Sequence, residues 1–291
     1  MRPIVRTSPE ATITYKTLLV HVDDSERCAQ RVEVASRIAL DFAARLVGAY
    51  LVPTPALTPS VSALLPDSVV SQRLEQSGEA QERAEARFRE TTGGAGLAAV
   101  EWRAPSGNPT RAIVAHARSG DLAIIGQPDP RDTDAAFLND IANAVVLESG
   151  RPVLAIPYIG ASGPVGKIAL VALDHSRESA RAVADALPLL ARARKVFVRA
   201  ITASAEETFD EAQARTQVVA FLRGHGIDAE VRHLDRPNIA IGELLLSQAA
   251  DVGADLIVMG AYGHARFQEF VVGGVTRTML ETMTVPVLMS H

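Results

Sequence analysis

The chain repeats itself, and the repeat limits how it can fold. Asp23 and Asp174 each follow a short apolar run and precede an x-Ser step, and they lie 174 − 23 = 151 residues apart. Gly126 and Gly260 lie 260 − 126 = 134 residues apart, and a proline further along each copy keeps that offset. The constant register indicates a duplicated domain whose first copy carries 151 − 134 = 17 extra residues.

Within each copy, short apolar runs alternate with segments of helical periodicity. This alternation predicts an α/β fold of two tandem open parallel five-stranded sheets flanked by helices. The glycine-rich stretch 160–166 divides an N-terminal domain, 1–160, from a C-terminal domain, 161–291. The expected strands are 16–22, 46–52, 98–103, 122–126 and 153–156, then 167–173, 195–201, 230–234, 255–260 and 284–290.

The second copy has a glycine-rich region directly after its apolar run 256–259. We expect Gly260 and Gly263 to take positive φ and to let the backbone lie close to a ligand. Gly273 and Gly274 then precede a predicted helix over 275–283, whose first N–H groups and positive dipole end suit a phosphate. The alternative is that these glycines serve only as turns.

The glycine spacing matches neither GxGxxG nor GxxxxGK[ST], so it favours neither a Rossmann dinucleotide site nor a Walker loop. It resembles the G-x2-G-x9-G-[S/T] nucleotide-binding signature of the universal stress protein family. The chain departs from that signature at one place, where Gly274 stands instead of Ser or Thr and Thr276 follows two residues later.

The resemblance implies that each copy is one universal stress protein domain and that the C-terminal domain binds ATP or ADP, with Mg²⁺ able to accompany the phosphates. In that family an Asp after the first strand contacts the adenine–ribose end, which corresponds here to Asp23 and Asp174. The alternative is that each Asp-x-Ser pair only caps a helix, with Ser25 starting the first one. The expected ligand-binding residues are Asp174, Gly260, Gly263, His264, Arg266, Gly273, Gly274, Val275 and Thr276.

The first copy keeps Gly126 at the position of Gly260 but lacks the other three glycines. An offset of 134 places Asp129 opposite Gly263, Asn139 and Asp140 opposite Gly273 and Gly274, and Ala142 opposite Thr276. The same loop also carries Asp132 and Asp134. Because carboxylates repel a polyphosphate, we expect the N-terminal domain not to bind ATP.

Composition excludes several classes of function. The net charge of −5 argues against nucleic acid as a partner, and the longest apolar runs are too short to cross a membrane. The histidines show no metal-binding spacing, and Cys28 is the single cysteine, so we expect a small buried hydrophobe there. No secretory signal is visible at the start, and we expect a cytoplasmic protein.

Three functions remain open at this point. The first is a regulatory nucleotide-binding protein of the stress response. The second is a slow ATPase, with His264 and then Asp174 as the nearest candidates to activate water, although no catalytic residue is assigned. The third is a nucleotide-free interaction protein. The resemblance further implies that the last strands of the two copies pair to form an internal pseudo-dimer, and it leaves homodimerisation open.

Overall fold

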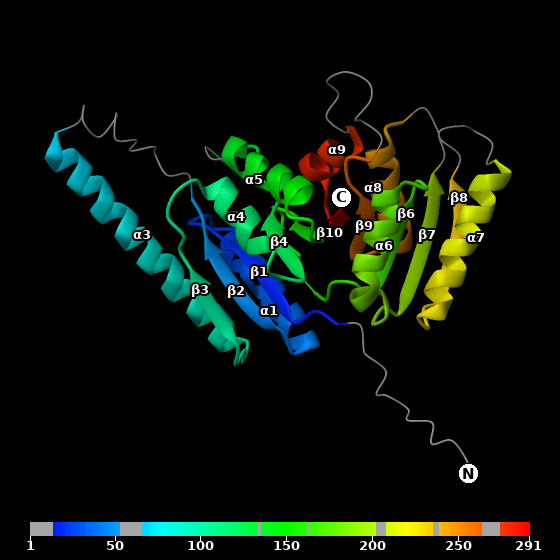
Figure 1. The fold of residues 1–291 in the computed structure, drawn as a ribbon, viewed down its shortest axis with the longest axis horizontal. Coiled ribbons are helices and arrows are strands. Elements are labelled where there is room, and N and C mark those ends of the chain that lie inside the picture. Colours follow the sequence, from blue (N-terminus) through cyan, green and yellow to red (C-terminus); the bar gives the residue numbers. More distant parts are fainter. Residues whose placement is uncertain are drawn as a thin grey trace, which may run out of the picture.

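The computed structural model describes residues 14–52, 66–132, 135–161, 163–201, 208–234, 239–263 and 274–291. The strands among these residues form one ten-stranded sheet in the order β3-β2-β1-β4-β5-β10-β9-β6-β7-β8 (Figure 1). Within each half of the chain, neighbouring strands run parallel. The predicted α/β class with parallel strands flanked by helices is confirmed.

The first half contains the longest helix, α3, which lies along one end of the molecule in Figure 1. Its 28 residues exceed the 16 of α7, the helix at the matching place in the second half. The elements of this half are β1 (Thr17–Val22), α1 (Cys28–Phe42), β2 (Arg45–Tyr50), α3 (Asp67–Gly94), β3 (Val100–Arg103), α4 (Pro109–Ala117), β4 (Leu122–Gly126), α5 (Ala135–Glu148) and β5 (Val153–Ile156).

The second half repeats this order. Its elements are β6 (Ile168–Leu173), α6 (Arg177–Leu190), β7 (Lys195–Ile201), α7 (Phe209–Gly224), β8 (Ala229–Leu234), α8 (Ile241–Val252), β9 (Leu256–Gly260), α9 (Gly274–Thr282) and β10 (Val287–Ser290). Successive side chains of each strand point to opposite faces of the sheet, so they pack into two hydrophobic cores. One core lies under α1, α3, α6 and α7, and the other under α4, α5, α8 and α9.

The two halves meet at the centre of the sheet. β5 and β10 pair antiparallel, with Ala155 opposite Val287, Leu154 opposite Leu288 and Val153 opposite Met289. All four residues of each strand are buried. The two predicted five-stranded sheets are therefore joined edge to edge into one.

The two Asp-x-Ser steps start their helices differently. Ser176 caps α6, because its hydroxyl oxygen accepts the backbone N–H of Ser179 at 3.1 Å. In the first half α1 starts only at Cys28, and its N-cap residue, Arg27, has no side-chain bond to the helix. The prediction that Ser25 caps α1 is wrong, since its hydroxyl is bound to Asp23 instead.

Candidate functional site

The predicted site lies at the carboxyl ends of β6 and β9. These strands are neighbours, but β6 continues toward β7 whereas β9 pairs with β10 on its other side. Such a reversal of strand order opens a crevice between the loops and is where open α/β sheets bind ligands. The described residues predicted for the site and found at this end are Asp174, Gly260, Gly263, Gly274, Val275 and Thr276; His264, Arg266 and Gly273 lie outside the described residues.

Asp174 is fixed by the serine that caps the next helix. The hydroxyl of Ser176 donates to Oδ1 of Asp174 at 2.6 Å, and the backbone N–H of Ser176 donates to the same oxygen at 3.0 Å. The capping alternative is thus confirmed for Ser176. A carboxylate held in one orientation suits recognition of a hydroxyl pair, so a ligand contact by Asp174 stays a prediction.

The spaces beside Gly260 and Gly263 are filled by the start of α6. A Cβ on Gly260 would lie 2.5 Å from the backbone nitrogen of Ser179, and one on Gly263 would lie 3.0 Å from Oε2 of Glu178. Gly260 is therefore required for α6 to pack against β9, whatever else it contacts. The expectation that these two glycines take positive φ is wrong, because Tyr262 adopts it instead, with φ of 60°.

Tyr262 ties the loop after β9 to two helices. Its backbone N–H donates to the hydroxyl of Thr276 in α9 at 3.2 Å, and its own hydroxyl bonds to Oδ1 of Asn143 in α5. Thr276 is only 2% exposed. Its hydroxyl oxygen holds the loop after β9 against α9.

Gly274 begins α9 next to free space. A Cβ built on it meets nothing within 4 Å among the described residues, and the residue is exposed. This is the position where the resemblance predicts a Ser or Thr. Among the described residues, nothing would obstruct a hydroxyl at this position.

Glu178 is a member of the site that the sequence did not predict. Its side chain is only 4% exposed, and Oε1 accepts a hydrogen bond from Nε of Arg177 at 2.6 Å, while Oε2 is the atom closest to the space beside Gly263. Burial works to raise the pKa of this carboxyl, but the hydrogen bonds and the Arg177 charge outweigh it and hold the pKa below its usual range. A buried negative charge therefore lies against the loop expected to bind phosphate.

The corresponding crevice of the first half is filled by Arg31. Its Nη2 lies 2.8 Å from Oδ2 of Asp23, and its Nε donates to the carbonyl of His21 at 2.7 Å. A Cβ on Gly126 would lie 2.2 Å from Nη1 of Arg31, so the guanidinium lies directly against the end of β4. Arg31 is 3% exposed and Asp23 6% exposed.

Burial and the neighbouring charges shift the pKa values of two residues in this region, Asp23 and His21. Burial alone would raise the pKa of Asp23, but Arg31 and the bonds from Ser25 hold that pKa far below its usual range. Burial lowers the pKa of His21 to about 4, and its Nε2 lies 2.7 Å from the carbonyl oxygen of Leu51. Because a carbonyl only accepts, the neutral ring carries its hydrogen on Nε2.

The loop after β4 carries its own counter-charge. Arg131 donates to both carboxylate oxygens of Asp129, from Nε at 3.0 Å and from Nη2 at 2.8 Å. The expected repulsion of phosphate by Asp129 is thereby reduced. Asp134 lies outside the described residues.

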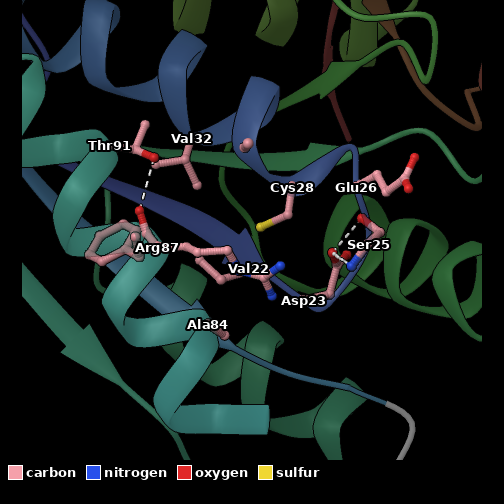
Figure 2. Close-up of a pocket in the computed structure, with 11 residues that line it drawn as sticks. Val22, Asp23, Ser25, Glu26, Cys28, Val32, Ala84, Arg87 and Thr91 are labelled. Atoms are coloured by element: carbon pink, nitrogen blue, oxygen red, sulfur yellow. Dashed lines mark hydrogen bonds between the residues drawn. The ribbon is translucent and has the colours of Figure 1, made fainter.

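A small cavity of about 70 Å³ opens between α1 and α3, next to Asp23 (Figure 2). The side chain of Cys28 points into it, and Arg87 lies on the α3 side. Cys28 is 8% exposed, and burial raises the pKa of its thiol, as befits a small buried hydrophobe rather than a reactive nucleophile.

The two halves thus differ at two helix positions that the repeat aligns. With the offset of 151, Arg31 corresponds to Ala182, and Arg27 corresponds to Glu178. Where the first half has Arg31, the second half has a small residue, and where the first half has the positive Arg27, the second half has the negative Glu178. These differences between the two copies are the sequence signal that could have pointed to Arg31 and Glu178 as special residues.

Together, the doubled α/β fold and its crevices at the strand ends define a tandem protein of the open parallel-sheet class. The chain belongs to the universal stress protein family, whose model matches residues 14–157 and again residues 167–291. The resemblance seen in the motifs is confirmed.

Solved structures of this family share the fold over nearly the whole chain. A universal stress protein from Archaeoglobus fulgidus DSM 4304 superposes with a TM-score of 0.71 at 16% identity, covering 94% of this chain and 95% of that one. A putative universal stress protein from Pseudomonas aeruginosa UCBPP-PA14 gives a TM-score of 0.59 at 16% identity, covering 95% and 93%. Among curated proteins, no match was found.

Two further observations concern the described residues only. None of their helices is both long and apolar enough to cross a membrane. Within the same ranges, no three His, Cys, Asp or Glu side chains gather in a way that could hold a metal ion.

Proposed function

We propose that the C-terminal half binds an adenine nucleotide and acts as a regulatory module of the stress response. The observation that carries this proposal is the orientation of Asp174, which Ser176 holds at the carboxyl end of β6, beside β9; α9, whose first residue Gly274 is exposed, follows β9 in the chain. A fixed carboxylate suits ribose hydroxyls, and the free N–H groups of a helix start suit phosphate.

ATP or ADP is the ligand that the glycine spacing predicts, with Mg²⁺ offsetting the phosphate charge. The role is binding rather than turnover, so any hydrolysis is expected to be slow. The first half contributes no equivalent site in this proposal, because Arg31 occupies the space beside Gly126 and is already paired with Asp23.

The test is to denature freshly purified protein, to identify released nucleotide by chromatography, and to titrate the nucleotide-free protein with Mg-ATP by calorimetry. One adenine nucleotide per chain is expected. No released nucleotide together with no heat of binding would overturn the proposal.

The repeat supplies a reciprocal pair of variants. Gly263→Asp gives the second loop the residue of the first and places a second carboxylate beside Glu178, so nucleotide binding should be lost. Asp129→Gly gives the first loop the residue of the second, and the stoichiometry should stay at one. Circular dichroism of both variants checks that the fold is retained.

A second candidate is a nucleotide-free interaction protein. The filled spaces beside Gly260 and Gly263 favour it, because both glycines already have a structural reason to be there. Under this alternative Gly263→Asp would disturb packing without any nucleotide to lose, and calorimetry of the wild type would show no heat.

We further propose that the two halves act as an internal pseudo-dimer. Besides the β5–β10 pairing, Tyr15 donates its hydroxyl to the carbonyl of Asp185 at 2.8 Å, and Arg181 donates to the carbonyl of Gly150 at 3.0 Å. Light scattering across concentration tests whether a homodimer forms in addition.

A further inference from the structure

Glu178 is a charged group that lies beside the loop of the proposed site. It is the second residue of α6, which Ser176 caps, and its Oε2 would lie 3.0 Å from a Cβ built on Gly263. Its Oε1 is paired with Arg177, whose side chain is 78% exposed, whereas the side chain of Glu178 is 4% exposed. The carboxylate oxygen that faces Gly263 is therefore not the one bound by Arg177.

Asp174 adds a second negative charge nearby. Its Oδ1 is bound by Ser176, and the side chain of Ser176 also borders the space beside Gly263, with its Cβ and Oγ both 3.3 Å from a Cβ built there. A phosphate bound against Gly263 would therefore lie beside the Glu178 carboxylate and beside the serine that holds Asp174. Such repulsion grows with each negative charge that the ligand carries.

The repeat places the opposite charge at this position in the first half, where Arg27 aligns with Glu178. Asp129 is the counterpart of Gly263, and Arg131 binds both of its carboxylate oxygens. The loop residue of the first half is thus bound by an arginine, whereas the loop residue of the second half has a carboxylate beside it.

We infer that Glu178 determines which adenine ligand the C-terminal site accepts, by disfavouring nucleotides in proportion to the negative charge of their phosphates. This inference rests on the proposed nucleotide-binding function. Without a divalent cation, the site prefers AMP to ADP and ADP to ATP. Mg²⁺ reduces the difference because it neutralises phosphate charge.

The experiment measures the affinities of adenosine, AMP, ADP and ATP by calorimetry, with EDTA and then with Mg²⁺, for wild type, Glu178→Gln and Glu85→Gln. Gln has nearly the shape of Glu and keeps an acceptor for Arg177. Glu85 lies in α3 of the first half and is paired with Arg89 as Glu178 is with Arg177, so its variant removes the same charge from an ion pair outside the proposed site.

In EDTA, Glu178→Gln should raise the ratio of ATP affinity to adenosine affinity by about tenfold, as expected for removal of one nearby charge. Glu85→Gln should leave that ratio unchanged. An unchanged ratio in Glu178→Gln, or weaker Mg-ATP binding in that variant, would overturn the inference while nucleotide binding itself stands. Failure of all four ligands to bind any of the proteins would instead overturn the proposed function.

Discussion

Arg31 and Asp23 form a buried ion pair in which Nη2 of the guanidinium lies 2.8 Å from Oδ2 of the carboxylate. Arg31 also bonds to the carbonyl of His21, so it joins the end of β1 to α1 and packs against Gly126 of β4. The pair fills the crevice of the first half with the protein's own charges.

Replacing Arg31 should destabilise the protein strongly. Arg31→Met keeps much of the bulk but leaves the buried carboxylate of Asp23 without its arginine partner, which should lower the free energy of unfolding by about 3–5 kcal/mol. Arg45→Met is the matched control, because it breaks an exposed pair with Glu101 and should cost under about 1 kcal/mol. Urea unfolding monitored by circular dichroism measures both, and equal costs would contradict the assignment.

Stability should fall on mild acidification because of His21. Its pKa is about 4 in the folded protein and near 6.5 when unfolded. Between these values the unfolded chain binds the proton and the folded chain does not, so the free energy of unfolding decreases as the pH falls through this window. From pH 7 to pH 5 the loss from this group is about 2 kcal/mol.

The control for this pH dependence is His21→Gln, whose amide can still donate to the carbonyl of Leu51 but does not titrate. Urea unfolding at pH 7 and pH 5 should show a smaller loss in the variant than in the wild type. Identical losses would show that other groups dominate the acid response. The stabilisation that Asp23 provides is still present in this window. It is lost only at lower pH, below the unfolded pKa of about 3.9, because the folded pKa of Asp23 is lower still.

Gly274→Ser should tighten nucleotide binding at the proposed site. The new side chain would enter free space at the start of α9 and would add the hydroxyl that the family signature has there. One additional hydrogen bond to a charged phosphate should improve the affinity by about tenfold. Gly274→Ala separates this effect from any change in the helix start, and equal affinities of the two variants would exclude a hydroxyl contact.

Two glycine-to-alanine changes should have opposite effects on stability. A Cβ on Gly48 in β2 would lie 2.7 Å from Cζ of Phe88, whose ring also packs against Trp102 with centroids 5.4 Å apart. The ring must shift, which should cost about 1–3 kcal/mol. Gly78 lies inside α3 with nothing within 4 Å of its would-be Cβ, so Gly78→Ala should stabilise by up to about 1 kcal/mol.

Thermal and urea denaturation of the Gly48 and Gly78 variants would check the signs. A destabilising Gly78→Ala would mean that this part of α3 has contacts beyond those described. A neutral Gly48→Ala would mean that Phe88 can move without loss.

Periodicity predicted the architecture because each strand and helix is largely decided locally. The bounds expected for β4, β5 and β7 agree with the structure to the residue. Short apolar runs ending in glycine or proline leave little choice of register, and the repeat allowed each half to check the other.

Long-range packing decided what the sequence did not reveal. Arg31 and Glu178 occupy helix positions where charged side chains usually face solvent, and only the contact of α1 with β4 and of α6 with β9 shows that they are buried. The packing of α6 against β9 was also invisible in the sequence. Gly260 was therefore expected to lie close to a ligand, whereas the structure shows it beside the backbone of α6.

The antiparallel pairing of β5 with β10 has a consequence for how the chain is made. β5 is completed long before β10 emerges from the ribosome, so the nascent first half presents a strand edge whose N–H and C=O groups are unpaired until the second half has folded beside it. All four side chains of β5 are buried in the finished protein, so this waiting edge is also apolar. In the finished protein, β10 of the second half covers this edge and prevents it from pairing with another chain. A first half produced alone should therefore self-associate through the edge of β5.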